Sequence, residues 1–222
     1  MSGPFSDYVK EAADQYLWML SEGYPQKASL KLVGDKYMLP RDMRQVLYRG
    51  VAPSDLAAQR KKKIGVVEKG DLVLIDTYNV LFTINNYLLG KPLFICNDGM
   101  LRDAGEMRGR IINKPQFSRS VSLMLDVLQL WPEASYIHYL DEPVSHSGRL
   151  SMELCKDMVQ MGIEGDAHTV KSPDHMLLQE RSSAICTSDG AIIDHYRGKV
   201  IDLPRYLLEK YFKPDLPVLI QE

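Results

Sequence analysis

The sequence has few of the features that mark specialised proteins. Its 222 residues include only three cysteines, 15 glycines and 12 prolines, which excludes a disulfide scaffold and a collagen-like repeat. No apolar run approaches the roughly 18 residues that a membrane span needs. The formal charge is 27 − 29 = −2, so the chain as a whole has no bulk attraction for nucleic acid. With 45% hydrophobic and 25% charged residues, the composition predicts a globular protein of one large or two small domains.

The three cysteines, Cys96, Cys155 and Cys186, lie far apart within apolar sequence. This pattern predicts buried thiols in a reducing compartment. The first residues, 1–4, lack the basic and apolar regions of a signal peptide. We therefore expect a cytoplasmic protein without a membrane partner.

Charge and pattern differ between the two parts of the chain. Residues 1–63 carry 11 Lys and Arg against 7 Asp and Glu, whereas residues 64–222 carry 16 against 22. Apolar residues recur at helical spacing in the first part, in the segments 5–21, 27–33, 42–48 and 54–63. The sequence predicts a small, basic, all-helical domain over residues 1–66, of the helix-turn-helix-like kind that binds nucleic acid.

The basic residues of this predicted domain gather towards its end. Between residues 26 and 63 there are 10 basic against 3 acidic side chains, and the stretch ends in Arg60, Lys61, Lys62 and Lys63. One interpretation is that these side chains contact the phosphates of a nucleic acid, RNA in preference to DNA. The alternative is that they solvate the outer face of a small bundle. A homodimer is left open.

After residue 70 the pattern changes to short apolar runs that alternate with helical stretches. The expected strands are 72–75, 92–95, 136–140, 167–170, 184–186 and the weaker 199–203. The expected helices are 80–89, 117–131, 149–161, 175–181 and 204–212. Because strands without polar alternation are buried on both faces, residues 67–222 are predicted to form a three-layer α/β domain with a mostly parallel sheet. The turn residues around 92–95 leave a hairpin or an inserted loop open.

An aspartate follows each of five expected strands. They are Asp76, Asp98, Asp141, Asp174 and Asp189. Each by itself could be a helix cap or a turn residue. Ligands of parallel α/β sheets bind outside the carboxyl ends of the strands, so the set predicts an acidic edge. Repulsion among these carboxylates favours a divalent cation, and hard oxygen ligands suit Mg²⁺ or Mn²⁺.

The short sequence motifs around three of these aspartates resemble those of the PIN-like metal-dependent nucleases, particularly their NYN branch. The sequence reads Asp76-Thr77-Tyr78-Asn79-Val80, then Ser172-Pro173-Asp174-His175, then Thr187-Ser188-Asp189. The resemblance implies that Asp76, Asp174 and Asp189 are catalytic metal ligands and that Asn79 steadies Asp76. It leaves open whether Asp98 or Asp103 is a ligand or shapes a turn. The whole chain also resembles an uncharacterised prokaryotic family with a helical domain before a PIN-like domain.

The loop between residues 141 and 149 is a further candidate. The hydroxyls of Ser145 and Ser147, with Arg149, could seat a phosphate at the start of a helix. The alternative is an ordinary cap by one of the two serines.

The sequence lacks the motifs that several other classes of enzyme require. Tyr78 stands where a haloacid-dehalogenase-type phosphatase needs its second aspartate, and the sequence contains no P-loop, no glycine-rich dinucleotide turn and no Gly-x-Ser-x-Gly elbow. Two hypotheses remain. The first is a Mg²⁺- or Mn²⁺-dependent endonuclease, in particular a ribonuclease. The second is a non-catalytic nucleic-acid-binding or regulatory protein with a degenerate PIN-like domain. The first requires Asp76, Asp141, Asp174 and Asp189 to converge.

Overall fold

The chain forms two compact units in a computed structural model that describes residues 5–104, 115–179, 182 and 184–220. The helical unit comprises residues 1–62, 90–106 and 214–222. The sheet unit comprises residues 63–89 and 107–213. The expected division into 1–66 and 67–222 therefore differs from the observed one in two ways. Residues 63–66 belong to the sheet unit, and residues 90–106 and 214–222 belong with the N-terminal helices.

Four helices occupy the first stretch of the helical unit. They are α1 (Asp7–Ser21), α2 (Gln26–Lys36), α3 (Arg41–Gly50) and α4 (Ser54–Lys63). In α1 the apolar side chains recur every three or four residues, and the set from Val9 to Leu20 is buried. Gly23 follows the helix with a φ of +83°, which a residue with a Cβ rarely adopts. The expected helical pattern of this stretch is confirmed.

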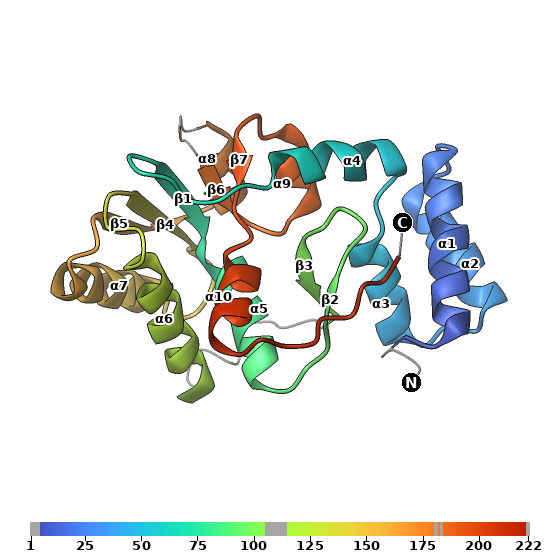
Figure 1. Cartoon of the computed structure of the whole chain (residues 1–222), viewed down its shortest axis with the longest axis horizontal. Helices are drawn as coiled ribbons and strands as arrows, with labels where there is room; N and C mark the ends of the chain where they lie inside the picture. Colours follow the sequence, from blue (N-terminus) through green and yellow to red (C-terminus); the bar gives the residue numbers. More distant parts are fainter. Residues whose placement is uncertain (1–4, 105–114, 180–181, 183, 221–222) are drawn as a thin grey trace. The chain divides into compact units, whose positions relative to one another are not determined.

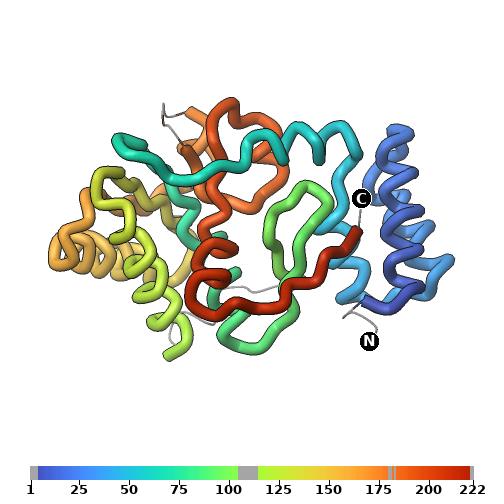
Figure 2. The backbone as a smooth tube through the Cα atoms, in the orientation of Figure 1, coloured from blue at the N-terminus to red at the C-terminus, as the bar shows by residue number. Residues whose placement is uncertain are grey.

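A hairpin and the C-terminal segment complete this unit. Strands β2 (Leu93–Ile95) and β3 (Leu101–Asp103) pair antiparallel around Gly99, whose φ is +81°. Figure 2 shows the C-terminal segment beside the hairpin, where the backbone N–H of Leu219 donates to the carbonyl of Ile95 at 3.0 Å. The interpretation of 92–95 as a strand of the parallel sheet is therefore wrong, and the hairpin alternative is confirmed.

The core of the helical unit shows why these distant stretches belong together. Phe94, Cys96, Leu219 and Ile220 are buried in the same apolar cluster as the inner faces of α1 and α3. A Cβ added at Gly50 would lie 2.5 Å from a ring carbon of Phe94, so α3 approaches the hairpin too closely for a larger residue. The four helices therefore do not enclose this core alone.

The sheet unit is built on five parallel strands. These are β1 (Leu72–Asp76), β4 (Ser135–Asp141), β5 (Gly165–Val170), β6 (Ala184–Cys186) and β7 (Lys199–Val200). Their order across the sheet is β5-β4-β1-β6-β7, as Figure 1 shows. Central β1 is a continuous apolar run because it is flanked by strands on both sides, and Val73, Leu74 and Ile75 are completely buried. The expected parallel sheet is confirmed.

Helices connect these strands. They are α5 (Thr77–Leu88), α6 (Pro115–Leu128), α7 (Ser147–Met161), α8 (Pro173–Gln179), α9 (Gly190–His195) and α10 (Leu203–Tyr211). Helices α5, α6 and α10 pack against one another, α7 packs on β4 and β5, and α8 packs on β1, β4 and α9. Within the described ranges, no helix combines the length and apolarity needed to cross a bilayer.

The strand order reverses at the centre of the sheet. From β1 the chain moves to β4 and β5 on one side, and it then returns to β6 and β7 on the other. In open α/β sheets, ligands bind at such a reversal, outside the carboxyl ends of the strands. The carboxyl ends of β1, β4 and β6 are therefore the place to look for a site.

Candidate functional site

Asp76 is the last residue of β1 and lies buried at the carboxyl edge of the sheet. One carboxylate oxygen accepts a hydrogen bond from the hydroxyl of Thr187 at 3.0 Å, and the other accepts one from the backbone N–H of Asn79 at 3.4 Å. Burial raises the pKa of Asp76 to about 7, and the charges of Asp141 and Asp174 act in the same direction. The two hydrogen bonds oppose that rise without cancelling it.

Asn79 connects the start of α5 to the loop that follows β6. Its side-chain oxygen accepts two hydrogen bonds from Ser188, one from the backbone N–H at 2.9 Å and one from the hydroxyl at 3.0 Å. The loop is thus fixed at two points, to α5 through Asn79 and to β1 through the bond from Thr187 to Asp76. Thr187 and Ser188 were present in the sequence motif, but the pattern alone assigned them no role.

Three more carboxylates stand at the same edge. Asp141 ends β4, Asp174 lies in the first turn of α8, and Asp189 caps the N-terminus of α9. Burial and the charge of Asp174 raise the pKa of Asp141. Burial and the charge of Asp189 raise the pKa of Asp174. Charge repulsion therefore acts from Asp141 and Asp174 on Asp76, from Asp174 on Asp141 and from Asp189 on Asp174. Whether the four carboxylates converge on one cation stays a prediction.

The chain supplies little to offset this repulsion. Among the residues that the structure describes, none of the four carboxylates forms an ion pair with Lys or Arg. Asp189 does accept backbone hydrogen bonds from Ala191 and Ile192, at 2.8 and 3.3 Å, as a helix cap does. Within the same described ranges, no three His, Cys, Asp or Glu side chains are grouped closely enough to hold a metal ion.

The nearby histidine does not provide the missing positive charge. His138 lies in the middle of β4 and is completely buried. Burial lowers its pKa to about 4, so the ring is neutral at pH 7. Its Nδ1 lies 3.3 Å from the hydroxyl of Thr77, and its Nε2 finds no hydrogen-bond partner in the part of the chain that the structure describes.

Asp98 and Asp103 were left open as ligands or supporting residues of the site or as turn residues, and the structure corrects the first interpretation for both. Asp98 lies in the hairpin turn, where its two oxygens accept from the guanidinium of Arg102 at 2.8 Å each. A third bond comes from Arg60 at 3.0 Å. Asp103, at the end of β3, pairs with Arg49 at 2.7 Å. These carboxylates belong to the helical unit and neutralise its arginines.

The basic run at the end of α4 is not a single solvated face. Arg60 is largely buried against Asp98. The ammonium of Lys63 donates to the backbone carbonyls of Ile193 and Asp194 at 2.6 and 3.2 Å. Lys61 is half-buried and Lys62 is exposed. The expectation that all four side chains face a nucleic acid is therefore wrong for Arg60 and Lys63, because each has a structural partner.

The loop after β4 also differs from the expected phosphate seat. The hydroxyl of Ser147 donates to the carbonyl of Glu142 at 3.3 Å, and Ser145 is exposed. His146 precedes α7 with a φ of +68°, and its side chain does not cap the helix. Arg149 pairs with Glu153 at 2.8 Å. The positive charge of Arg149 is therefore matched within its own helix, and neither serine acts as the expected cap.

Comparison with known proteins gives relatives without assigned activities. Residues 68–206 match the family described as "Domain of unknown function (DUF5616)", and residues 8–63 match "Protein of unknown function (DUF434)". The chain is 27% identical to "Uncharacterized protein MJ0935" of Methanocaldococcus jannaschii over 198 residues, which cover 88% of this chain and 94% of that protein. No solved structure matches. The hairpin of the helical unit lies inside the stretch matched by the first family.

Proposed function

The chain belongs to the DUF5616 family, and because the description of that family assigns no activity, we propose from the geometry that it is a Mg²⁺- or Mn²⁺-dependent endonuclease that hydrolyses phosphodiester bonds of RNA. One observation carries the proposal. At the carboxyl edge of a parallel sheet, burial and the charges of neighbouring aspartates raise the pKa values of Asp76, Asp141 and Asp174, and no arginine or lysine among the described residues pairs with them or with Asp189.

The donor set fits a hard divalent cation. All four side chains offer carboxylate oxygens, which Mg²⁺ and Mn²⁺ prefer. The buried His138 is neutral at pH 7, and burial raises the pKa of the nearby Cys186 thiol, so neither brings a charge to the edge. Asp76, Asp174 and Asp189 would hold the ion, with Asp141 beside them. A cation there would offset the repulsion that raises the pKa values, so metal binding and ionisation of the acids favour each other.

The chain's own residues prepare this edge for hydrolysis. Thr187 and Asn79 fix the orientation of Asp76, and Ser188 holds Asn79 in place. When bound, a divalent ion activates water and neutralises charge on the leaving oxygen.

The resemblance to PIN-like nucleases supports the same proposal. Its residues, Asp76, Asn79, Asp174 and Asp189, come from β1, α5, α8 and the cap of α9, and the three acids belong to the acidic edge. The amide of Asn79 stands beside Asp76, where the resemblance implies a steadying role. The choice of RNA over DNA rests on this resemblance alone.

A second candidate has its own observation. Because no three acidic, histidine or cysteine side chains of the described residues are grouped for an ion, the sheet unit could be a degenerate domain that binds nucleic acid without cleaving it. Mn²⁺ binding separates the two candidates. An endonuclease binds Mn²⁺ at Asp76, whereas the non-catalytic protein binds RNA in EDTA and leaves it intact.

The test compares labelled single-stranded RNA, and DNA of the same sequence, in Mn²⁺ and in EDTA. We expect cleavage of the RNA in Mn²⁺, and we expect Asp76→Asn to reduce the rate by about a hundredfold or more. Asp126→Asn is the matched control, because Asp126 is an exposed aspartate on α6 of the same unit. Cleavage that survives Asp76→Asn unchanged would indicate a contaminant and end the catalytic proposal.

A further inference from the structure

A groove between α6 and α7 in the sheet unit has no role in the proposed hydrolysis. Its volume is about 520 Å³, which lies in the range of small-molecule sites. Phe117, Val121 and Leu150 give it an apolar floor, and Phe117 and Leu150 are buried. Among the described residues of its lining, Arg149, Glu153 and Asp157 carry charge, and His146 can carry one when protonated. A flat apolar ring with polar edges fits such a lining.

The first turns of α6 and α7, which help to line the groove, lie at the same end of the sheet as the four aspartates. Helix α7 begins after the carboxyl end of β4, which carries Asp141, and its first turn contributes Arg149 to the groove. Helix α6 leads into β4 from the opposite direction, so its N-terminal half, with Val121, lies at the carboxyl edge. A polynucleotide bound at the aspartates can therefore reach this groove.

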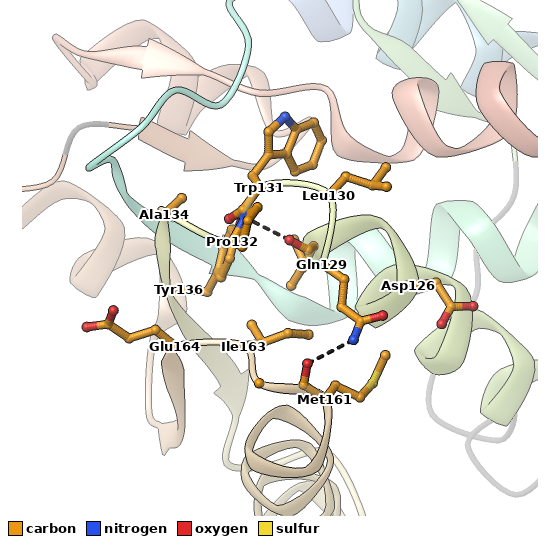
Figure 3. A pocket seen from close by; sticks show the side chains of 12 residues that line it. Asp126, Gln129, Leu130, Trp131, Pro132, Ala134, Tyr136, Met161, Ile163 and Glu164 are labelled. Carbon is orange, nitrogen blue, oxygen red and sulfur yellow. Dashed lines mark hydrogen bonds between the residues drawn. The ribbon is translucent and has the colours of Figure 1, made fainter.

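A second groove provides a comparison at the opposite end of the same helices. It has a volume of about 380 Å³ and lies where β4 and β5 begin. Figure 3 shows Trp131 and Tyr136 among its lining residues, and the amide of Gln129 donates to the carbonyl of Met161 at 2.8 Å. Its place at the amino ends of the strands separates it from the acidic edge.

The charged side chains of the groove between α6 and α7 determine which chemical groups of a ligand it can bind. Arg149 is already paired with Glu153, and Asp157 adds a second carboxylate. The net negative charge disfavours a phosphate group. Carboxylates accept hydrogen bonds from N–H groups. A nucleobase that presents N–H donors satisfies both the apolar floor and this rim.

Guanine fits these groups best among the RNA bases. Its ring N–H and its amino group are neighbouring donors on one edge, which one carboxylate can bind together, and its carbonyl can accept from an arginine. We propose that the groove between α6 and α7 binds a guanine base of the RNA next to the scissile phosphate. This inference rests on the proposed nuclease function and adds a specificity site to it.

The first test measures binding without catalysis. Guanosine, adenosine, cytidine and uridine are titrated in EDTA into the ¹⁵N-labelled full-length protein, and amide shifts are followed by NMR. We expect guanosine to bind most tightly, with shifts in α6 and α7. Val121→Trp fills the groove and should weaken guanosine binding about tenfold or more, whereas Leu130→Trp in the second groove should leave it unchanged. Equal binding of the four nucleosides would overturn the inference.

A second variant tests the same inference in case Val121→Trp prevents the protein from folding. Glu153 is exposed on α7, so Glu153→Ala removes the acceptor without disturbing the core. It should weaken guanosine binding by about tenfold while the melting temperature stays that of the natural protein. Undiminished guanosine binding in this variant would reject guanine recognition by the groove.

Cleavage then separates the two proposals. RNA with a single guanine should be cut in Mn²⁺ beside that guanine, and Val121→Trp should remove the preference without removing cleavage. If cleavage persists with no preference for guanine, the nuclease function stands and this inference fails. If guanosine binds the groove and no RNA is cleaved, the nuclease function fails and the base site stands as a guanosine site.

Discussion

The two groups of aspartates in this chain have opposite electrostatic surroundings. In the hairpin of the helical unit, burial acts to raise the pKa of Asp98, but the adjoining guanidinium of Arg102 outweighs it and holds the pKa below its usual value. At the edge of the sheet unit, burial acts on Asp76 without such a partner, and its pKa rises to about 7. The comparison teaches that burial alone does not decide the role of an aspartate. Where the chain itself supplies a positively charged partner, as Arg102 does for Asp98, the aspartate stabilises the fold.

The hairpin shows how such a partner is supplied. Asp98 and Arg102 are four residues apart across the turn at Gly99, so the hairpin brings them together. Arg60 then adds a second guanidinium from α4. At the sheet edge, the four aspartates follow four different segments, and the described residues provide no basic side chain to pair with them. The negative charge at that edge is therefore not neutralised by the described residues, and a bound cation can neutralise it.

The largest expected effect breaks the hairpin ion pair. Asp98→Asn leaves the buried guanidinium of Arg102 without its counter-charge, so the free energy of unfolding should fall by about 3–5 kcal/mol. Asp174→Asn is the matched change at the sheet edge, where it removes a repelling charge, and it should cost about 0.5 kcal/mol or less. Urea unfolding at pH 7 measures both. Equal losses would contradict the distinction between the two groups.

The next effect concerns pH. The pKa of Asp76 is about 7 in the folded protein, whereas that of an unperturbed aspartate is 3.8. The folded state therefore holds its proton more tightly, and the free energy of unfolding should fall as pH rises from about 4 to about 7 and then level off. Each pK unit is worth about 1.4 kcal/mol, so the fall amounts to a few kcal/mol.

The variant Asp76→Asn isolates this contribution. Because an amide does not ionise, the variant should lack that part of the pH dependence and should be more stable than the natural protein at pH 8. Urea unfolding of both proteins at pH 5 and pH 8 checks the expectation. A variant with the same dependence on pH as the natural protein would show that Asp76 is not the titrating group.

A smaller effect is expected from the cation itself. If Mn²⁺ binds the folded protein at the acidic edge, it should raise the free energy of unfolding by about 2.7 kcal/mol at a free concentration a hundred times its Kd. Asp76→Asn should lose most of this gain, whereas Asp98→Asn should keep it although its starting stability is lower. Thermal unfolding with and without Mn²⁺ provides the measurement. A gain of the same size in both variants would place the ion elsewhere.

The smallest expected effect removes one hydrogen bond from Asp76. Thr187→Val deletes the hydroxyl that donates to the carboxylate and keeps the shape of the side chain. The pKa of Asp76 should rise further, by about one unit, so the fall in stability should extend to higher pH. Thr169→Val, at an exposed position of β5, serves as the control. A ¹³C titration of the carboxyl groups reports the shift directly.

The parts of the fold set by local pattern could be predicted from the sequence. Buried β1 and β6 have continuous apolar runs, and α1 and α7 have helical spacing over 15 residues each. Helix α9, of six residues, is too short to give a periodic signal and was not expected from the sequence, and β3, of three, was expected only within the hairpin alternative. The place of the hairpin was not predictable locally, because Phe94 is buried by α1 and α3 rather than by its sequence neighbours.

In the candidate site, too, the features set by local sequence pattern were predictable and those set by tertiary packing were not. The edge positions of Asp76, Asp141, Asp174 and Asp189 follow from strand ends in a parallel sheet, and these could be inferred from the order of runs along the chain. The partners of Asp98 and Asp103 could not. Arg60 lies 38 residues from Asp98, and Arg49 lies 54 residues from Asp103. Pairing over such separations depends on tertiary packing, which an isolated motif does not encode.

The helical unit is built from three separate stretches of the chain, and this limits how its first stretch can be transferred to other proteins by evolution or by engineering. The segment that matches DUF434 ends at residue 63, yet the cluster around its helices also takes Phe94, Cys96, Leu219 and Ile220 from later in the chain. This segment is therefore not a portable module that could be moved intact to another protein. A gene that encoded it alone would have to replace those four apolar side chains from another source, such as a companion subunit.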